Sequence, residues 1–194
     1  MKALTHTYNY TLCSYDELNE QDRNLIDSAK RATEQSYAPY SHFYVGAAVL
    51  LSDGSTITGT NQENAAYPSG MCAERTALFY AASAYPNKAV SALAIAAYTK
   101  GEFTTTPLAP CGTCRQVMLE MEQRHNRPIR ILLYGTEGII IIEGGVKEIL
   151  PLTFSAEFLK SYKYRCTRVI NRCTLRRSEI LYYLCATKLY GSVA

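Results

Sequence analysis

The central apolar run of the chain reads VSALAIAAY, from Val90 to Tyr98, with Ser91 as its exception. A strand that is apolar on both faces is typical of a sheet covered by helices on both sides. Helical patterns flank this run along the chain, at Met71–Tyr85 and at Cys111–Asn126. The run therefore predicts the central strand of a layered α/β domain.

Further elements extend the pattern on both sides of this strand. Ser14 and Glu17 form a capping-box signature, which predicts an amphipathic helix that begins there and ends near Tyr37. Four more strands are predicted, at Tyr44–Leu51, Thr56–Asn61, Ile129–Tyr134 and Gly138–Glu143. Two short helices are expected, around Val146–Leu150 and from Ser155 to about Tyr164. The fold class predicted is α/β, in three layers, with a five-stranded mixed sheet between helices.

Composition limits the class of protein. The chain has 194 residues, 47% of them hydrophobic, which is enough to bury one core without disulfides or metals. No apolar run approaches the roughly 18 residues that cross a bilayer, and the N-terminal segment lacks the apolar core of a signal peptide. We therefore expect a cytoplasmic protein with no membrane partner. Its seven cysteines are an odd number, more typical of free thiols or metal ligands than of a disulfide framework.

The charge is distributed unevenly along the chain. Residues 1–160 hold 13 Lys and Arg against 16 Asp and Glu, whereas residues 161–194 hold 7 against 1. We therefore divide the chain into a domain over 1–160 and a basic C-terminal extension over 161–194. The extension either packs on the body or acts as an arm for nucleic acid or another acidic partner. A mildly acidic body offers no broad surface for nucleic acid.

Three cysteines stand at spacings that suit a metal site. Cys111 and Cys114 lie one turn apart at the start of a predicted helix, and Cys72 lies in the first turn of the preceding one. A helix N-terminus favours the thiolate form of cysteine. Three protein ligands leave the fourth position of tetrahedral zinc open to water, as in a catalytic site. Glu74, two residues after Cys72, is close enough to reach that water without binding the metal.

Each part of this pattern also has a simpler interpretation. A Cys-x-x-Cys pair occurs in redox sites and structural zinc fingers, and a single Cys72 is commonly a small buried apolar residue. Glu74 alone would suit the first turn of any helix. A structural site of four cysteines lacks a fourth ligand at a matching spacing. The combined pattern on two helix starts favours a catalytic zinc site.

Four segments together resemble the cytidine deaminase family, in the small homotetrameric form that acts on free nucleosides. They are YSHFYVGAA (Tyr40–Ala48), NQENAAYP (Asn61–Pro68), CAERTA (Cys72–Ala77) and PCGTCRQ (Pro110–Gln116). The resemblance covers about residues 14–160 in order. It implies the three-layer cytidine-deaminase-like fold, bound Zn²⁺, a homotetramer or alternatively a homodimer, and a place in pyrimidine salvage.

The resemblance also implies roles around the metal. Cys72, Cys111 and Cys114 match the zinc ligands, Glu74 the proton carrier, and Arg75 an arginine beside the thiolates. Hydrolytic deamination of cytidine or 2′-deoxycytidine would follow: zinc and Glu74 convert water to hydroxide, which attacks C4 of cytosine. Glu74 then protonates N3 and later the departing amine, so that uridine or 2′-deoxyuridine and ammonia result.

Five further residues match substrate contacts of the family. They are Asn61 and Glu63 for the ribose, Ala65 for a backbone contact to the pyrimidine, Phe43 for packing on the base, and Phe154 for the neighbouring subunit's pocket. The structural alternatives are an interstrand hydrogen bond for Asn61, a surface carboxylate for Glu63 and core packing for Phe43. Arg115 is interpreted as a cation on the helix surface or at an interface.

Other functions on the same pattern stay open. A nucleic-acid or nucleotide cytosine deaminase resembles it with His at the first ligand position, where this chain has Cys72. A deaminase of a cytosine-bearing antibiotic shares the zinc motifs. A structural-zinc interaction module would bind zinc without releasing ammonia from any cytosine compound.

Overall fold

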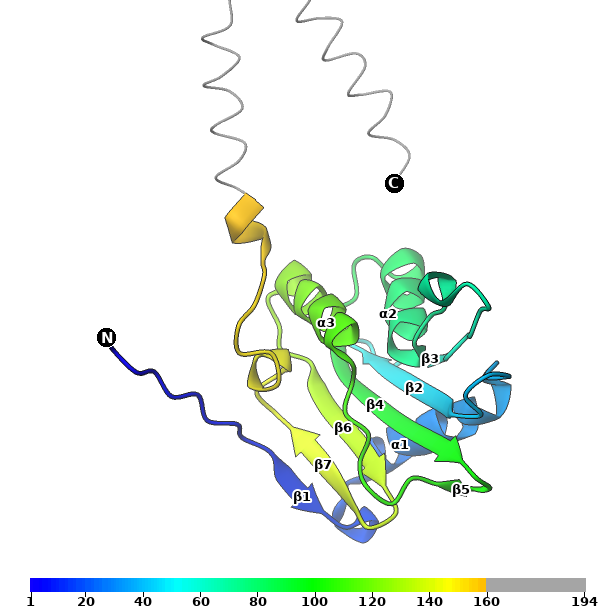
Figure 1. Ribbon diagram of the computed structural model, residues 1–194. Coiled ribbons are helices and arrows are strands. Elements are labelled where there is room, and N and C mark those ends of the chain that lie inside the picture. The colour runs from blue at the N-terminus through cyan, green and yellow to red at the C-terminus, as the bar shows by residue number, and fades with distance from the viewer. Residues whose placement is uncertain (160–194) are drawn as a thin grey trace, which may run out of the picture. The chain divides into compact units, whose positions relative to one another are not determined.

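Helices cover both faces of a mixed β-sheet (Figure 1). The structure, a computed structural model, describes residues 1–159. Helix α1 (Glu20–Ala32) packs on one face, and α2 (Ala73–Ala84) and α3 (Gly112–His125) pack on the other. The predicted three-layer α/β fold with a mixed sheet is confirmed. Its compact unit comprises Met1–Thr153, and Phe154 begins a second unit.

The sheet has seven strands in the order β1-β7-β6-β4-β2-β3, with β5 paired to β4. Their bounds are Thr11–Cys13 for β1, Tyr44–Leu51 for β2, Thr56–Thr60 for β3, Val90–Thr99 for β4, Glu102–Phe103 for β5, Arg130–Gly135 for β6 and Gly138–Ile142 for β7. Strands β4 and β6 pair in parallel, and the other described strand pairs are antiparallel.

The predicted count of five strands is too low, because β1 and β5 were missed. Strand β5 has two residues and β1 has three, with Thr11 and Leu12 exposed, so neither shows a period-two apolar pattern. Strand β1 forms by pairing with β7, whose residues lie about 130 positions later in the sequence, as Thr11 opposite Ile141 shows. Local sequence carries no signal for a pairing of that range.

The predicted start of the first helix is also wrong. Ser14 and Glu17 do form a capping box, with the Ser14 amide donating to the Glu17 carboxylate at 2.7 Å. It caps only a 3₁₀ turn, η1 (Tyr15–Glu17), because Leu18 adopts an extended backbone and its side chain enters the core. Helix α1 begins at Glu20, where Asn19 is the N-cap and its side chain accepts from the Asp22 amide.

Shorter elements complete the described chain. The 3₁₀ turns η2, η3 and η4 span Thr33–Gln35, Tyr67–Ser69 and Val146–Glu148. The last of these replaces the helix expected around Val146–Leu150. The second half of the helix predicted from Ser155 to about Tyr164, and the whole extension over 161–194, lie outside the described residues. None of the helices in residues 1–159 is long and apolar enough to cross a membrane.

Strand β4 lies between the two cores. Leu93 and Ile95 point into the core beneath α2 and α3, while Ala92, Ala94 and Ala96 pack toward α1. This alternation explains why Val90–Tyr98 is apolar without a period, since both faces of the strand are covered. The central strand predicted from this run is confirmed.

Strand direction determines where α2 and α3 begin. Strand β2 is antiparallel to both β3 and β4, and β4 is parallel to β6, so β3, β4 and β6 run the same way. Helix α2 follows β3 along the chain, and α3 follows β4 after the two-residue strand β5. Both helices begin beyond the carboxyl ends of these parallel strands, where the cysteines of their first turns lie together. In open α/β sheets this edge is the usual place for a ligand site.

Candidate active site

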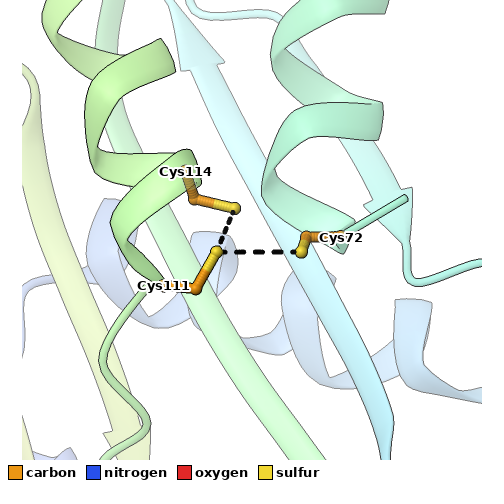
Figure 2. A group of neighbouring side chains, drawn as sticks. All are labelled: Cys72, Cys111 and Cys114. Carbon is orange, nitrogen blue, oxygen red and sulfur yellow. Dashed lines mark hydrogen bonds between the residues drawn. The ribbon is translucent and has the colours of Figure 1, made fainter. Parts of the chain in front are cut away.

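The N-terminal ends of α2 and α3 bring three cysteine sulfurs together (Figure 2). Cys72 and Cys111 are the N-cap residues of the two helices, and Cys114 lies in the first turn of α3. The Sγ atoms of Cys72 and Cys111 are 3.9 Å apart, those of Cys111 and Cys114 are 3.4 Å apart, and all three lie within 4.8 Å of one another.

These spacings fit zinc. Tetrahedral coordination with Zn–S bonds of about 2.3 Å places the sulfurs about 3.8 Å from one another. Neither N-cap cysteine uses its side chain to cap its helix, so both sulfurs are available as ligands. The two helix N-termini also stabilise the thiolate form that zinc requires.

Arg75 and the neighbouring thiols act on the ionisation of Cys72 and Cys114. Hydrogen bonds from Cys114 and from Arg75 lower the pKa of Cys72 to about 5. The Arg75 Nη2 group donates to the Cys72 sulfur at 3.6 Å. The pKa of Cys114 is raised, because it donates to Cys72 and is itself buried. Arg75 therefore places a positive charge beside the Cys72 sulfur.

Glu74 lies beside the sulfurs in the first turn of α2 and is only 5% exposed. Burial raises the pKa of its carboxyl above the ordinary value, and the Cys72 charge raises it further. A desolvated carboxyl next to a metal site is suited to accepting and returning a proton.

An open cleft of about 400 Å³ adjoins the cluster. Its polar lining includes Cys72, Cys111, Glu74, Arg75, Asn61 and Glu63, and part of its apolar wall comes from Val45, Met71 and Leu108. A volume of this size suits a small organic molecule. Val45 and Leu108 are wall residues that the motifs did not predict. Val45 lies in the first motif and Leu108 lies two residues before Pro110, so their closeness to the motifs could have indicated that they line the site.

Asn61 and Glu63 are held firmly at the cleft. The Asn61 side chain joins β3 to β2, since its Nδ2 donates to the Phe43 carbonyl at 2.9 Å and its Oδ1 accepts from the Val45 amide at 2.8 Å. The Glu63 carboxylate accepts from the amides of Tyr40 and Ser41, at 2.9 and 3.2 Å. Hydrogen bonds from Ser41 and Tyr40 lower the pKa of Glu63.

The structure does not bring every expected substrate residue to this cleft. Phe43 and Ala65 are outside its lining, although the Phe43 carbonyl is bound by Asn61. Phe154 begins the second unit of the chain, where its ring stacks on that of Phe158 at 5.8 Å. Its expected position in a neighbouring subunit's pocket stays a prediction.

The comparisons with known proteins agree with this geometry. The family model described as the cytidine and deoxycytidylate deaminase zinc-binding region matches residues 19–126. A cytidine deaminase of Halalkalibacterium halodurans is 47% identical over 133 residues, which cover 69% of this chain and 93% of that relative. The chain belongs to the cytidine deaminase family. A second family member, from Sporosarcina psychrophila, is 44% identical over 135 residues, covering 70% of this chain and 92% of its own.

Solved structures of cytidine deaminases share the fold. The crystal structure of the Burkholderia pseudomallei protein has a TM-score of 0.58 and 40% identity, covering 68% of this chain and 97% of its own. That of the Mycobacterium tuberculosis protein has a TM-score of 0.55 and 31% identity, covering 71% and 99%. The matched part of the chain therefore spans nearly the full length of both of these proteins.

Proposed function

We propose that this protein is a zinc-dependent cytidine deaminase, which hydrolyses cytidine and 2′-deoxycytidine to uridine and 2′-deoxyuridine with release of ammonia. The observation that carries the proposal is the group of three cysteine sulfurs within 4.8 Å of one another, next to buried Glu74 in a cleft. The relatives named cytidine deaminase support the choice of substrate.

Cys72, Cys111 and Cys114 would hold the zinc ion. When bound, zinc supplies Lewis-acid chemistry, which lowers the pKa of a coordinated water toward neutrality. Three thiolates and Zn²⁺ carry a net charge of −1, which opposes that effect. The N-termini of α2 and α3, together with Arg75, offset the excess negative charge.

Glu74 would carry the protons of the reaction. Its carboxylate takes one proton from the attacking water and delivers it to N3 of the cytosine ring. When the C4–N bond breaks, Glu74 passes the second water proton to the amino nitrogen, which leaves as ammonia. One water proton thus ends on N3 and the other on ammonia, while the water oxygen becomes the C4 carbonyl.

The substrate contacts are proposed from the family resemblance. Asn61 and Glu63 would bind ribose hydroxyls, and their hydrogen bonds to Phe43, Tyr40 and Ser41 would hold them in place without reorganisation. Phe43 would pack on the base and the backbone of Ala65 would contact it. Phe154 from a neighbouring subunit would close the pocket, which requires a homotetramer or homodimer. A role in cytoplasmic pyrimidine salvage completes the proposal.

The decisive experiment follows the change in ultraviolet absorbance as cytidine becomes uridine, with and without a zinc chelator. We expect turnover that the chelator abolishes and added zinc restores. Single-stranded DNA, single-stranded RNA and a cytosine-bearing antibiotic are assayed alongside. Preference for one of these over cytidine would contradict the proposal, as would bound zinc without ammonia release from any of them.

We also propose that the chemistry is contained in residues 1–160. Deleting residues 165–194 is expected to leave kcat and KM for cytidine unchanged, because every proposed site residue precedes the deletion. Loss of turnover in a folded, zinc-loaded truncated protein would show that the extension takes part in function. The oligomeric state of both proteins is measured in solution at the same time.

A further inference from the structure

Cys111 is the N-cap residue of helix α3, but its side chain makes no capping hydrogen bond. Ser, Thr, Asp or Asn at this position fixes the turn into a helix by accepting from a backbone amide. Cys111 makes no such bond, since its sulfur faces Cys72 and Cys114. The side chain of Cys111 therefore does not fix the backbone that places its own sulfur.

Arg115, four residues later, binds the backbone on both sides of Cys111 by donating to its carbonyls. Its Nε group donates to the carbonyl of Pro110 at 2.8 Å, and its own amide donates to the carbonyl of Cys111 at 3.0 Å. The carbonyl of Cys111 is thus bound by the ordinary helical bond from the Arg115 backbone, and the carbonyl of Pro110 by the Arg115 side chain. These bonds restrict the backbone torsions that aim the sulfur of Cys111.

The same guanidinium reaches a distant segment. Its Nη1 group donates to the carbonyl of Ile149 at 2.8 Å, 34 residues further along the chain. The turn before Cys111 is therefore anchored to the segment that follows η4, and not only to its own helix. The planar guanidinium presents several donors in fixed directions, which a lysine cannot imitate.

Helix electrostatics do not explain a cation at this position. Arg115 lies near the N-terminus of α3, where the helix dipole disfavours positive charge. Within residues 1–159 it forms no ion pair, and its side chain donates to two neutral carbonyls. The contribution of Arg115 therefore lies in those two hydrogen bonds.

Helix α2 has a related arrangement at its own N-cap cysteine. Thr76, four residues after Cys72, donates its amide to the Cys72 carbonyl at 3.0 Å. Its hydroxyl lies 3.1 Å from the carbonyl of Thr60, at the end of β3. In both helices the residue four positions after the cysteine ties the helix entrance to a neighbouring segment.

We propose that Arg115 is a positioning residue, which holds Cys111 in its ligand geometry by bridging the carbonyls of Pro110 and Ile149. The inference rests on the proposed zinc site and deepens it. It replaces the interpretation of Arg115 as a surface or interface cation. Retention of zinc, and not only activity, should depend on this side chain.

The test measures how fast an excess of a coloured chelator removes zinc from the loaded protein. Arg115→Gln is expected to release zinc about 10- to 100-fold faster than the wild type, the usual scale for residues that support metal ligands. Arg115→Lys should fall between, because one ammonium cannot bridge both carbonyls. The matched control is Arg124→Gln on the same helix, whose side chain is 50% exposed and lies 4.0 Å from Glu120.

Three further readouts separate positioning from general stability. Zinc content, the thermal midpoint with and without zinc, and kcat and KM for cytidine are measured for each variant. If Arg115 positions Cys111, zinc binding should raise the thermal midpoint of Arg115→Gln less than that of the wild type, and kcat should fall while KM stays similar.

The inference would be overturned if Arg115→Gln released zinc no faster than Arg124→Gln. It would also be overturned if Arg115→Gln lowered the thermal midpoints with and without zinc equally and released zinc at the wild-type rate. If Arg115→Gln does not fold, wild-type release from folded Arg115→Lys would overturn it. A wild-type protein that binds no zinc would instead refute the proposed function.

Discussion

Burial raises the pKa of two glutamates, Glu74 and Glu122, yet they have different surroundings. Glu74 lines the cleft beside the sulfurs, where a substrate can exchange protons with it. The carboxylate of Glu122 accepts from the amides of Ile129 and Val146, at 2.8 and 2.9 Å. At the scale of single residues, access to the cleft separates a candidate proton carrier from a structural acid.

Glu74→Gln should retain one zinc per chain and lose at least about 10²–10⁴ in turnover, the usual contribution of general acid–base catalysis. The amide keeps the size of the side chain but cannot accept a proton from water. Zinc content and uridine formation are measured on the same sample. Near-normal turnover with zinc bound would contradict the role of Glu74. Cys111→Ser and Cys114→Ser provide the contrast, since they should lose zinc together with activity.

The pH dependence of the stability of Glu122→Gln tests whether folding raises the pKa of Glu122. A carboxyl whose pKa is raised by folding favours the folded state at low pH, and this contribution is lost as pH rises through the folded pKa. As pH rises from below 4.5, the ordinary pKa of glutamate, to neutrality, the wild type should lose this stabilisation and Glu122→Gln should not. The free energy of unfolding of the variant should therefore rise relative to that of the wild type.

Denaturant unfolding at several pH values measures this difference. Glu120→Gln, exposed on the same helix, is the control for replacing a carboxylate at the helix surface. A constant difference for Glu122→Gln would show that folding does not raise the pKa of Glu122.

At the scale of elements, the position of Cys72 depends on how closely α2 approaches β3. A Cβ atom at Gly59 would lie 2.5 Å from both the Ala73 carbonyl and the Ala77 amide, so only glycine permits this contact. The first turn of α2 follows Cys72 directly. The packing of one helix on one edge strand therefore determines where a zinc ligand lies.

Gly59→Ala should displace the first turn of α2 and cost about 1–3 kcal/mol of unfolding free energy, as overpacking of a core does. It should also speed zinc release, because Cys72 moves with that turn. Gly112→Ala is the control for folding, since nothing lies within 4 Å of its added Cβ and alanine favours a helix. Equal stability of the two variants would show that the helix and strand can separate at no cost.

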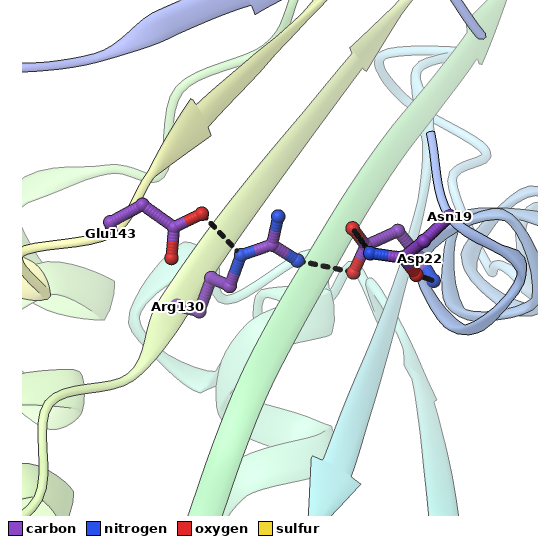
Figure 3. Close-up of polar contacts among 4 residues, drawn as sticks. All are labelled: Asn19, Asp22, Arg130 and Glu143. Carbon is purple, nitrogen blue, oxygen red and sulfur yellow. Dashed lines mark hydrogen bonds and ion pairs between the residues drawn. The ribbon is translucent and has the colours of Figure 1, made fainter. Parts of the chain in front are cut away.

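At the scale of the whole molecule, one arginine joins the layer of α1 to the sheet (Figure 3). Arg130, at the start of β6, forms ion pairs with Asp22 of α1 and with Glu143 after β7. The Asp22 side chain is 5% exposed and also accepts from Asn19 at 2.7 Å, whereas Glu143 is 65% exposed. The pair with Asp22 is therefore the one whose loss leaves a buried charge.

Arg130→Met should cost about 3 kcal/mol, the lower end of the range for breaking a buried ion pair, because it leaves the Asp22 carboxylate without its cation. Adding Asp22→Asn should recover most of this loss, since no buried charge then remains. Glu143→Gln should change stability by less than about 1 kcal/mol, as exposed pairs do. Denaturant unfolding of the single and double variants measures each free energy. Additive losses would mean that Asp22 and Arg130 do not interact.

The sequence by itself determined the layers and the chemistry. The run from Val90 to Tyr98 required a covered strand, and the cysteine spacings with Glu74 indicated a catalytic zinc site. Strands β1 and β5 were missed, because their few residues form strands only by pairing with distant partners. The start of α1 was misplaced, since burial of Leu18 overrides a local capping box.

The tertiary structure alone decided which groups meet. Two helices begin at one sheet edge because β3, β4 and β6 share a direction, and this brings Cys72 to Cys111. It also gives Arg115 the carbonyl of Ile149, a contact with no local signature. Residue types and their spacing are present in the sequence, and local backbone geometry converts that spacing into side chains that share one face of a helix or strand. Contacts between distant segments depend on strand pairing and packing, which only the folded chain provides.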